Sequence, residues 1–263
     1  MPGRARLACT ALAFGYAFLY LPIALVVIYS FNESRLVTVW AGFSTRWWQA
    51  LFANEQILSA AWLSLRIAVV SATVASLLGL AAGYALARVP RFPGRALFGS
   101  LVIAPMVMPE VVMGISMLLL FVGAEQLFGG PDRGFLTIAI AHVTFSIAFV
   151  AVVVQARLAD FDRSLEEAAM DLGATPWVVF RTITLPLIAP AVASGWLLAF
   201  TLSLDDLILT QFVAGAQSQT LPMTVFSKVR LGLDPQINAL ATIIVGIAAG
   251  ALILSGWLTR RKA

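Results

Sequence analysis

The sequence predicts an all-α membrane protein with six transmembrane helices, on the evidence of its composition and of its apolar stretches. Of the 263 residues, 60% are hydrophobic and 11% are charged, whereas soluble domains carry about 25% charged residues. Six apolar stretches are long enough to cross a hydrocarbon core of about 30 Å, which takes about 20 helical residues. Runs such as Ile243-Ile244-Val245 lack the alternating polarity of β-barrel strands.

We place the spans at residues 7–29, 67–87, 97–122, 135–156, 187–213 and 237–258, in one transmembrane domain over residues 1–263. Arginines precede the first span, as in a signal peptide, but the span exceeds the 7–15 apolar residues of such a peptide. Pro105 and Pro109 free backbone carbonyls and predict that the third helix is broken. Close helix contacts are expected at Gly79-x-x-x-Gly83 and Gly246-x-x-x-Gly250.

The basic residues predict that both termini are cytoplasmic. Eleven of the 17 Lys and Arg residues lie in the two termini and in the loops after the second and fourth spans. Loops that stay in the cytoplasm carry this excess. The pI near 9.7 does not indicate a nucleic-acid partner, because no polar stretch of domain size could carry a phosphate-binding face.

The longest cytoplasmic loop, residues 157–186, is predicted to form two short helices. Ser164 and Glu167 have the spacing of a capping box. Gly173 can take the left-handed conformation that ends a helix. A second helix is expected to begin at Thr175-Pro176 and to end at Leu185-Pro186.

The first helix of this loop is predicted to be amphipathic. Leu165, Ala168, Ala169 and Leu172 fall on one face, and acidic residues occupy the rest of the surface. Such a helix is suited to a groove in another protein. The alternative is a helix that lies on its own bundle or on lipid headgroups, although five acids disfavour an anionic membrane surface.

The same loop resembles the EAA loop of permease subunits in bacterial ABC importers, whose pattern is EAA, three residues, G, nine residues, I-x-L-P. The resemblance implies a type I importer permease in the bacterial inner membrane, with this loop as a helix-turn-helix that couples the spans to a cytoplasmic ATPase dimer. The coupling residues would be Glu167, Ala168, Ala169, Gly173, Ile183, Leu185 and Pro186.

The chain is not expected to be an enzyme. A Walker A loop needs G-x-x-x-x-G-K-[ST], and the two lysines, Lys228 and Lys262, do not follow a glycine. ATP and Mg²⁺ would therefore bind to a partner ATPase, and no cofactor, catalytic residue or metal site is expected here. The sole histidine, His142, is expected to be buried and hydrogen-bonded rather than a metal ligand.

Three acids lie within predicted spans: Glu110, Asp205 and Asp206. A charge at the bilayer centre costs about 2.5–3.5 kcal/mol on insertion scales, so such residues usually face a cavity or a partner. They are the candidates for a substrate pathway, which would attract a cation such as a diamine or polyamine. The alternative is structural pairing, with Arg66, with backbone or with a neighbouring subunit, or one aspartate that its neighbour keeps protonated.

The C-terminal half is similar to the putrescine and spermidine permeases, and most to the second permease of the putrescine system. The similarity implies import of a polyamine, putrescine rather than spermidine, with three protein partners: a second, homologous permease in a heterodimer, the ATPase dimer and a periplasmic polyamine-binding protein. Membrane lipid would surround the spans. A permease for another small organic cation or amino-acid-like solute, or an ion-gradient-driven secondary transporter, is the alternative. The similar stretches are residues 203–209, 221–223, 225–230 and 235–242.

Overall fold

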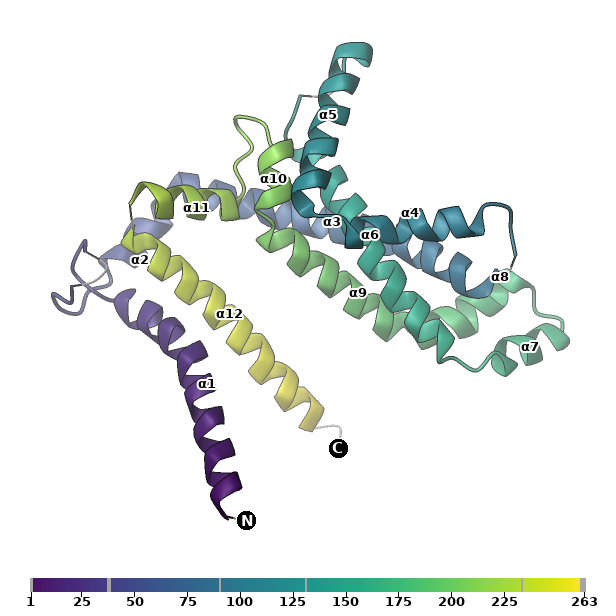
Figure 1. Cartoon of the computed structure of the whole chain (residues 1–263), viewed down its shortest axis with the longest axis horizontal. Coiled ribbons are helices and arrows are strands. Elements are labelled where there is room, and N and C mark those ends of the chain that lie inside the picture. Colours follow the sequence, from purple (N-terminus) through teal and green to yellow (C-terminus); the bar gives the residue numbers. More distant parts are fainter. Residues whose placement is uncertain (1, 37–38, 90, 131, 233, 261–263) are drawn as a thin grey trace. The chain divides into compact units, whose positions relative to one another are not determined.

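The computed structural model describes residues 2–36, 39–89, 91–130, 132–232 and 234–260 (Figure 1). In these residues the fold is helical, and extended backbone pairs at one bridge, between Asn32 and Phe43. The chain divides into two compact units. We call Met1–Leu58 with Val225–Ala263 the terminal unit and Ser59–Thr224 the central unit.

In the terminal unit, α12 (Pro235–Arg260) packs against α1 (Pro2–Tyr29) and α2 (Arg46–Phe52). The segment Leu7–Tyr29 of α1 has no buried residues, which suits a helix that faces lipid. Asp234 stabilises the start of α12, because its Oδ1 accepts the Gln236 N–H at 3.0 Å. Its Oδ2 accepts a hydrogen bond from Lys228 Nζ at 2.8 Å.

The central unit is built around α6 (Phe135–Ala159), which packs against five other helices of the described chain. Gly79 and Gly83 let α3 approach α6 closely: a Cβ on Gly79 would lie 2.6 Å from Val150 Cβ, and one on Gly83 would lie 2.8 Å from Ala151 O. This confirms the first predicted glycine contact. The neighbours of α6 are α3 (Glu55–Arg88), α4 (Arg95–Val107), α5 (Glu110–Phe128), α9 (Leu185–Asp205) and α10 (Ile208–Val213).

The second predicted glycine contact is wrong. A Cβ on Gly246 or Gly250 would meet nothing within 4 Å, so these glycines of α12 lie in open space among the residues that the structure describes. Patterns of this kind are frequent by chance in apolar helices, and this one mediates no close helix contact within the described chain.

Among the described residues, five helical segments are long and apolar enough to cross a membrane: Leu7–Tyr29, Glu55–Arg88, Glu110–Phe128, Phe135–Ala159 and Pro176–Asp205. Two shorter apolar segments, Arg95–Val107 and Pro235–Gly250, accompany them. The third predicted helix is indeed broken, because Met108 and Pro109 are extended between α4 and α5.

Two predicted helix boundaries differ from the structure. α3 begins at Glu55, twelve residues before the predicted start at residue 67, because its first turns continue the helix outside the most apolar stretch. A single helix over residues 187–213 is wrong, because α9 ends at Asp205 and α10 begins at Ile208. Asp206 has extended backbone (ψ 125°), and its carboxylate accepts the Thr210 N–H at 2.7 Å, so this side chain starts a new helix.

Candidate functional site

The predicted coupling loop forms two short helices, α7 (Ser164–Asp171) and α8 (Pro176–Val179), at the end of the central unit that is distant from α10 (Figure 1). Gly173 has a φ of +89°, which confirms its predicted left-handed conformation after the first helix. Thr175 is the N-cap of α8 and Pro176 its first residue, as predicted.

The capping box predicted at the start of α7 is wrong. Ser164 is the first helical residue, and the N-cap, Arg163, makes no side-chain capping hydrogen bond. Instead, the Ser164 backbone N–H donates to Asp162 Oδ1 at 2.9 Å. This hydrogen bond lowers the pKa of the Asp162 carboxyl, because it favours the charged form.

The predicted helix end at Leu185-Pro186 is also wrong. α8 continues through a π-helical turn, η1 (Phe180–Thr184), directly into α9. Pro186 then lies in the first turn of α9, where the missing N–H costs least. The π-helical turn η1 is wider than an α-helical turn and lies just before Pro186, so the helix continues through the proline.

The apolar face of α7 is exposed. Leu165 is 49% and Leu172 is 90% exposed, and Ala168 is exposed between them. This face therefore does not pack on the helices of its own unit, and it remains available to another protein. Of the other predicted coupling residues, Glu167, Gly173 and Pro186 are exposed, whereas Ala169, Ile183 and Leu185 are half-buried.

α7 is held to the spans by its opposite face. Glu166 Oε2 lies 2.9 Å from Arg88 Nε in an ion pair in which both side chains are about nine-tenths buried. Glu166 Oε1 accepts a hydrogen bond from Thr184 Oγ1 at 2.6 Å. The link joins the end of α3, the middle of α7 and the last residue of η1. The sequence did not predict it, because Arg88 is 78 residues from Glu166 and no local pattern connects them.

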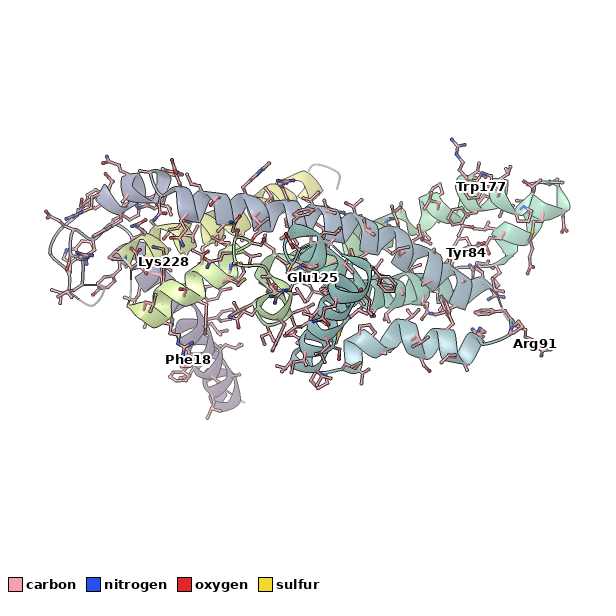
Figure 2. All side chains as sticks on the ribbon, turned by 90° about the horizontal axis from the view of Figure 1, so that it is seen from above. Phe18, Tyr84, Arg91, Glu125, Trp177 and Lys228 are labelled. Carbon is pink, nitrogen blue, oxygen red and sulfur yellow. The ribbon has the colours of Figure 1, made fainter. Side chains whose placement is uncertain are left out.

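Aromatic packing holds α8 against α3. The rings of Tyr84 and Phe180 meet edge to face with centroids 5.1 Å apart, and Trp177 stacks on Phe180 at 5.6 Å. Figure 2 shows Tyr84 and Trp177 at the same end of the central unit. Trp177 is nevertheless 68% exposed, so α8 also carries exposed apolar surface.

Of the three acids in predicted spans, Asp206 points inward. Its Oδ2 accepts the Thr210 hydroxyl at 2.5 Å, and it lies 3.3 Å from His142 Nε2. Together with the Thr210 backbone N–H, these contacts occupy that oxygen fully. Asp206 is therefore engaged by the protein itself.

His142 is buried and hydrogen-bonded, as predicted: its side chain is 2% exposed. Its Nδ1 lies 2.6 Å from Ser203 Oγ, and its Nε2 lies 2.9 Å from Thr210 Oγ1. Ser203 Oγ is in turn 3.0 Å from Ser71 Oγ. This network joins α3, α6, α9 and α10. Sequence reasoning missed it, because the partners of His142 lie 61 and 68 residues away along the chain.

Asp205 and Glu110 are both exposed in the central unit. In the described part of the chain, neither has a Lys or Arg within ion-pair distance. The suggested partner Arg66 places its guanidinium over the Phe135 ring instead, 5.2 Å from the centroid. These two carboxylates are therefore free for a cation from outside the chain.

Packing joins two helices that begin at or just after these carboxylates. α10, which follows the Asp205-Asp206 bend, packs against α5, whose first residue is Glu110. The contact requires Gly114, where a Cβ would lie 2.4 Å from Phe212 Cδ2. The break at Met108-Pro109 therefore precedes α5, the break at Asp206-Leu207 precedes α10, and these two helices pack against each other. Among the described residues, no three His, Cys, Asp or Glu side chains group as a metal site would require.

Comparisons with known proteins place the chain among importer permeases. Residues 75–261 match the family described as "Binding-protein-dependent transport system inner membrane component". The putrescine transport system permease protein PotI of Escherichia coli is 55% identical over 96% of this chain and 90% of its own length. The spermidine/putrescine transport system permease protein PotC of the same organism is 42% identical over 94% and 91%.

Solved structures support the same fold. A bacterial ABC transporter involved in the import of the acidic polysaccharide alginate has a TM-score of 0.73 at 16% identity, over 97% of this chain and 95% of its own. The MetNI methionine ABC transporter, in inward-facing conformations, has a TM-score of 0.61 at 17% identity, over 78% and 94%. The resemblance found in the EAA loop is thus confirmed, and the chain belongs to the family of binding-protein-dependent transport system inner membrane components.

Proposed function

We propose that this chain is the permease subunit of a polyamine importer that carries putrescine in preference to spermidine. The observation that carries the proposal is the 55% identity to the putrescine permease PotI along 96% of the chain, against 42% to the spermidine/putrescine permease PotC. The exposed carboxylates of the central unit agree with it, because a polyamine carries several ammonium groups and a pathway for it needs acidic contacts.

Asp205 is the strongest candidate for contact with substrate, and Glu110 is the second. Asp206 shares the same bend but is occupied by Thr210 and His142, so its role is to hold the start of α10. The bend leaves Asp205 as the last residue of α9, with its side chain exposed. A protein-held break next to an exposed carboxylate is typical of substrate sites in broken transporter helices.

The exposed face of α7 would dock on a cytoplasmic ATPase. Leu165, Ala168 and Leu172 supply the apolar contact, and Glu167 beside them supplies a polar one. The Arg88–Glu166–Thr184 link would transmit the movement of the ATPase to α3 and α9. ATP and Mg²⁺ would bind to that partner, and no cofactor would bind to this chain.

The remaining partners complete the importer. A periplasmic binding protein would deliver the polyamine. A second, homologous permease would supply the other half of the pathway, because alternating access needs two halves that move against each other. Both termini would lie in the cytoplasm, on the side of α7.

Uptake of labelled putrescine tests this function. Cells that lack the chain and its redundant polyamine importers should lose uptake, and the restored gene should rescue it. Excess spermidine should compete weakly. Unchanged uptake in the deletion strain would refute the polyamine assignment, although the family assignment would still stand on the whole-chain match.

A further inference from the structure

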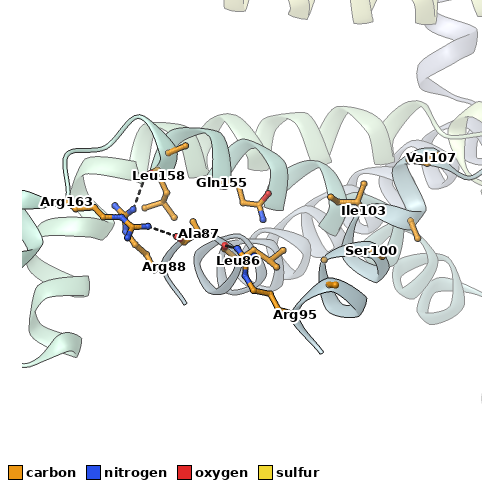
Figure 3. A pocket seen from close by; sticks show the side chains of 14 residues that line it. Leu86, Ala87, Arg88, Arg95, Ser100, Ile103, Val107, Gln155, Leu158 and Arg163 are labelled. Carbon is orange, nitrogen blue, oxygen red and sulfur yellow. Dashed lines mark hydrogen bonds between the residues drawn. The ribbon is translucent and has the colours of Figure 1, made fainter. Parts of the chain in front are cut away.

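An open pocket with a volume of about 800 Å³ lies between the end of α3, the length of α4 and the end of α6 (Figure 3). Arg88 is the last residue of α3, and Arg95 is the first of α4. Arg163 follows α6, at the start of α7. These three arginines line the pocket, and no Asp or Glu lines it. We call it the arginine pocket.

The arginines are held in place by backbone carbonyls. Arg88 Nη1 donates to Leu158 O at 3.1 Å, Arg95 Nη2 to Leu86 O at 2.7 Å and Arg163 Nη2 to Ala87 O at 3.0 Å. All three acceptors lie in the last turns of α3 and α6, where the helix dipole favours a cation. The guanidinium groups are therefore pre-oriented around the pocket without an anion.

The hydrogen bonds to these helix ends use only part of the N–H donors of the three arginines. Each guanidinium has five N–H donors, and the carbonyls take one from each residue. Arg88 Nη2 is buried and has no acceptor among the described residues. Glu166 balances the charge of Arg88, but no carboxylate in the described chain pairs with Arg95 or Arg163. The pocket therefore has donors and positive charge for an anion.

Apart from Ser100 and Gln155, the rest of the lining is apolar. Figure 3 shows Arg88 and Arg163 at one end of the pocket, Ile103 and Val107 at the other, and Arg95 between them. Ile103 is 38% and Val107 is 77% exposed, and the intervening Gly99 has no side chain. A free phosphate would leave this apolar wall in contact with water, whereas an acyl chain would cover it.

We propose that the arginine pocket binds the phosphate headgroup of an anionic phospholipid, with an acyl chain along α4. Arginines suit phosphate because they donate two parallel hydrogen bonds to its oxygens. The pocket lies at the ends of spanning helices, the depth at which headgroups lie, and basic pockets between such helices recognise anionic lipids. The proposal does not depend on which solute the chain carries.

Native mass spectrometry of the purified transporter complex tests the proposal. The complex, exchanged in detergent, should retain phosphatidylglycerol over phosphatidylcholine. The double variant Arg95→Gln/Arg163→Gln should retain about 25-fold less phosphatidylglycerol, since each arginine near an anionic headgroup contributes about fivefold. Arg91→Gln is the matched control, because Arg91 is an exposed arginine of the same loop outside the pocket, and it should retain lipid as the wild type does.

A second variant separates the lipid from a free anion. Gly99→Leu fills the pocket without changing its charge, and its Cβ would lie at an ordinary 3.6 Å from Leu86 Cδ2, so the fold should accept it. This variant should also lose phosphatidylglycerol. Equal retention of the two lipids by the wild type, or equal loss in Arg91→Gln, would overturn the proposal. So would displacement of the lipid by inorganic phosphate alone with Gly99→Leu unaffected, which would indicate a soluble-anion site.

Discussion

At the scale of single residues, Asp205 and Asp206 are neighbours with opposite environments. Asp206 is engaged by Thr210 and His142, whereas Asp205 is exposed. A proposed substrate contact and a structural contact are therefore adjacent in the sequence. Substitution separates the two roles. A change at Asp205 would remove a charge from the proposed pathway, whereas a change at Asp206 would remove hydrogen bonds that stabilise the fold.

Asp205→Asn should lower putrescine uptake about tenfold or more and leave thermal stability unchanged, because a lost charge-assisted contact costs about 1.5–3 kcal/mol. Asp206→Ala should instead destabilise the protein by about 2–3 kcal/mol, because the backbone N–H and the hydroxyl of the buried Thr210 lose their acceptor. Uptake at saturating and limiting putrescine, with thermal unfolding in detergent, measures both effects. Glu125→Gln, at an exposed acid of α5, is the control. Normal uptake by Asp205→Asn would remove that residue from the pathway.

At the scale of elements, the sequence predicted the long apolar helices, but it did not predict a helix break that depends on a side-chain hydrogen bond. α1, α6 and α12 begin and end within a few residues of their predicted bounds, apart from the start of α1, because about 20 apolar residues must be helical in a membrane. The two prolines identified the break between α4 and α5.

The break after α9 could not be predicted in the same way. It depends on one aspartate within an apolar run, whose carboxylate binds a backbone N–H four residues later. The candidate site shows the same limit. Glu110, Asp205 and Asp206 are conspicuous because they are acids in apolar stretches, but the sequence did not predict that His142 holds Asp206 and that Ser203 holds His142. Hydrogen bonds between side chains more than 60 residues apart leave no local pattern.

The turn between α7 and α8 should be essential for coupling. Gly173 has φ +89° and open space around it, so Gly173→Val would introduce no clash but would strain the backbone by about 1–2 kcal/mol and move α7. Uptake should be abolished while membrane insertion stays normal. Gly173→Asn should retain part of the activity, because Asn tolerates this conformation.

Gly129→Val is the matched control for this variant. Gly129 has φ +63° and equally open surroundings, but it lies after α5, outside the coupling loop. The strain should be comparable and uptake should persist. If both valine variants transport normally, the geometry of the α7–α8 turn has no role in coupling.

The exposed apolar face of α7 gives a test of docking that does not involve transport. Leu172→Asp should abolish copurification of the ATPase with the permease, because a charge replaces an apolar contact that docking would desolvate. It should not alter thermal stability, since Leu172 is 90% exposed. The ATPase should copurify normally with Leu231→Asp, a change at the 86% exposed last residue of α11 (Leu221–Leu231). An ATPase that still copurifies with Leu172→Asp docks elsewhere.

At the scale of the whole molecule, the distribution of basic residues and the position of α7 predict the same orientation. The arginine-rich loop after α3 and the coupling loop after α6 would face the cytoplasm, as would both termini. The loop between α5 and α6 would then face the periplasm. This arrangement would put the α7 face that is proposed to bind the ATPase, and the arginine pocket, on the cytoplasmic side of the membrane. Substrate would enter from the periplasmic side.

Single cysteines measure this orientation directly. The exposed Cys9 is first replaced by serine, and Arg91→Cys or Asp132→Cys is then introduced at an exposed position after α3 or α5. A membrane-impermeant maleimide should label Asp132→Cys in intact spheroplasts and Arg91→Cys only after permeabilisation. The reverse pattern would place α7 in the periplasm, where no ATPase could reach it, and would overturn the coupling assignment while leaving the helices and the family unchanged.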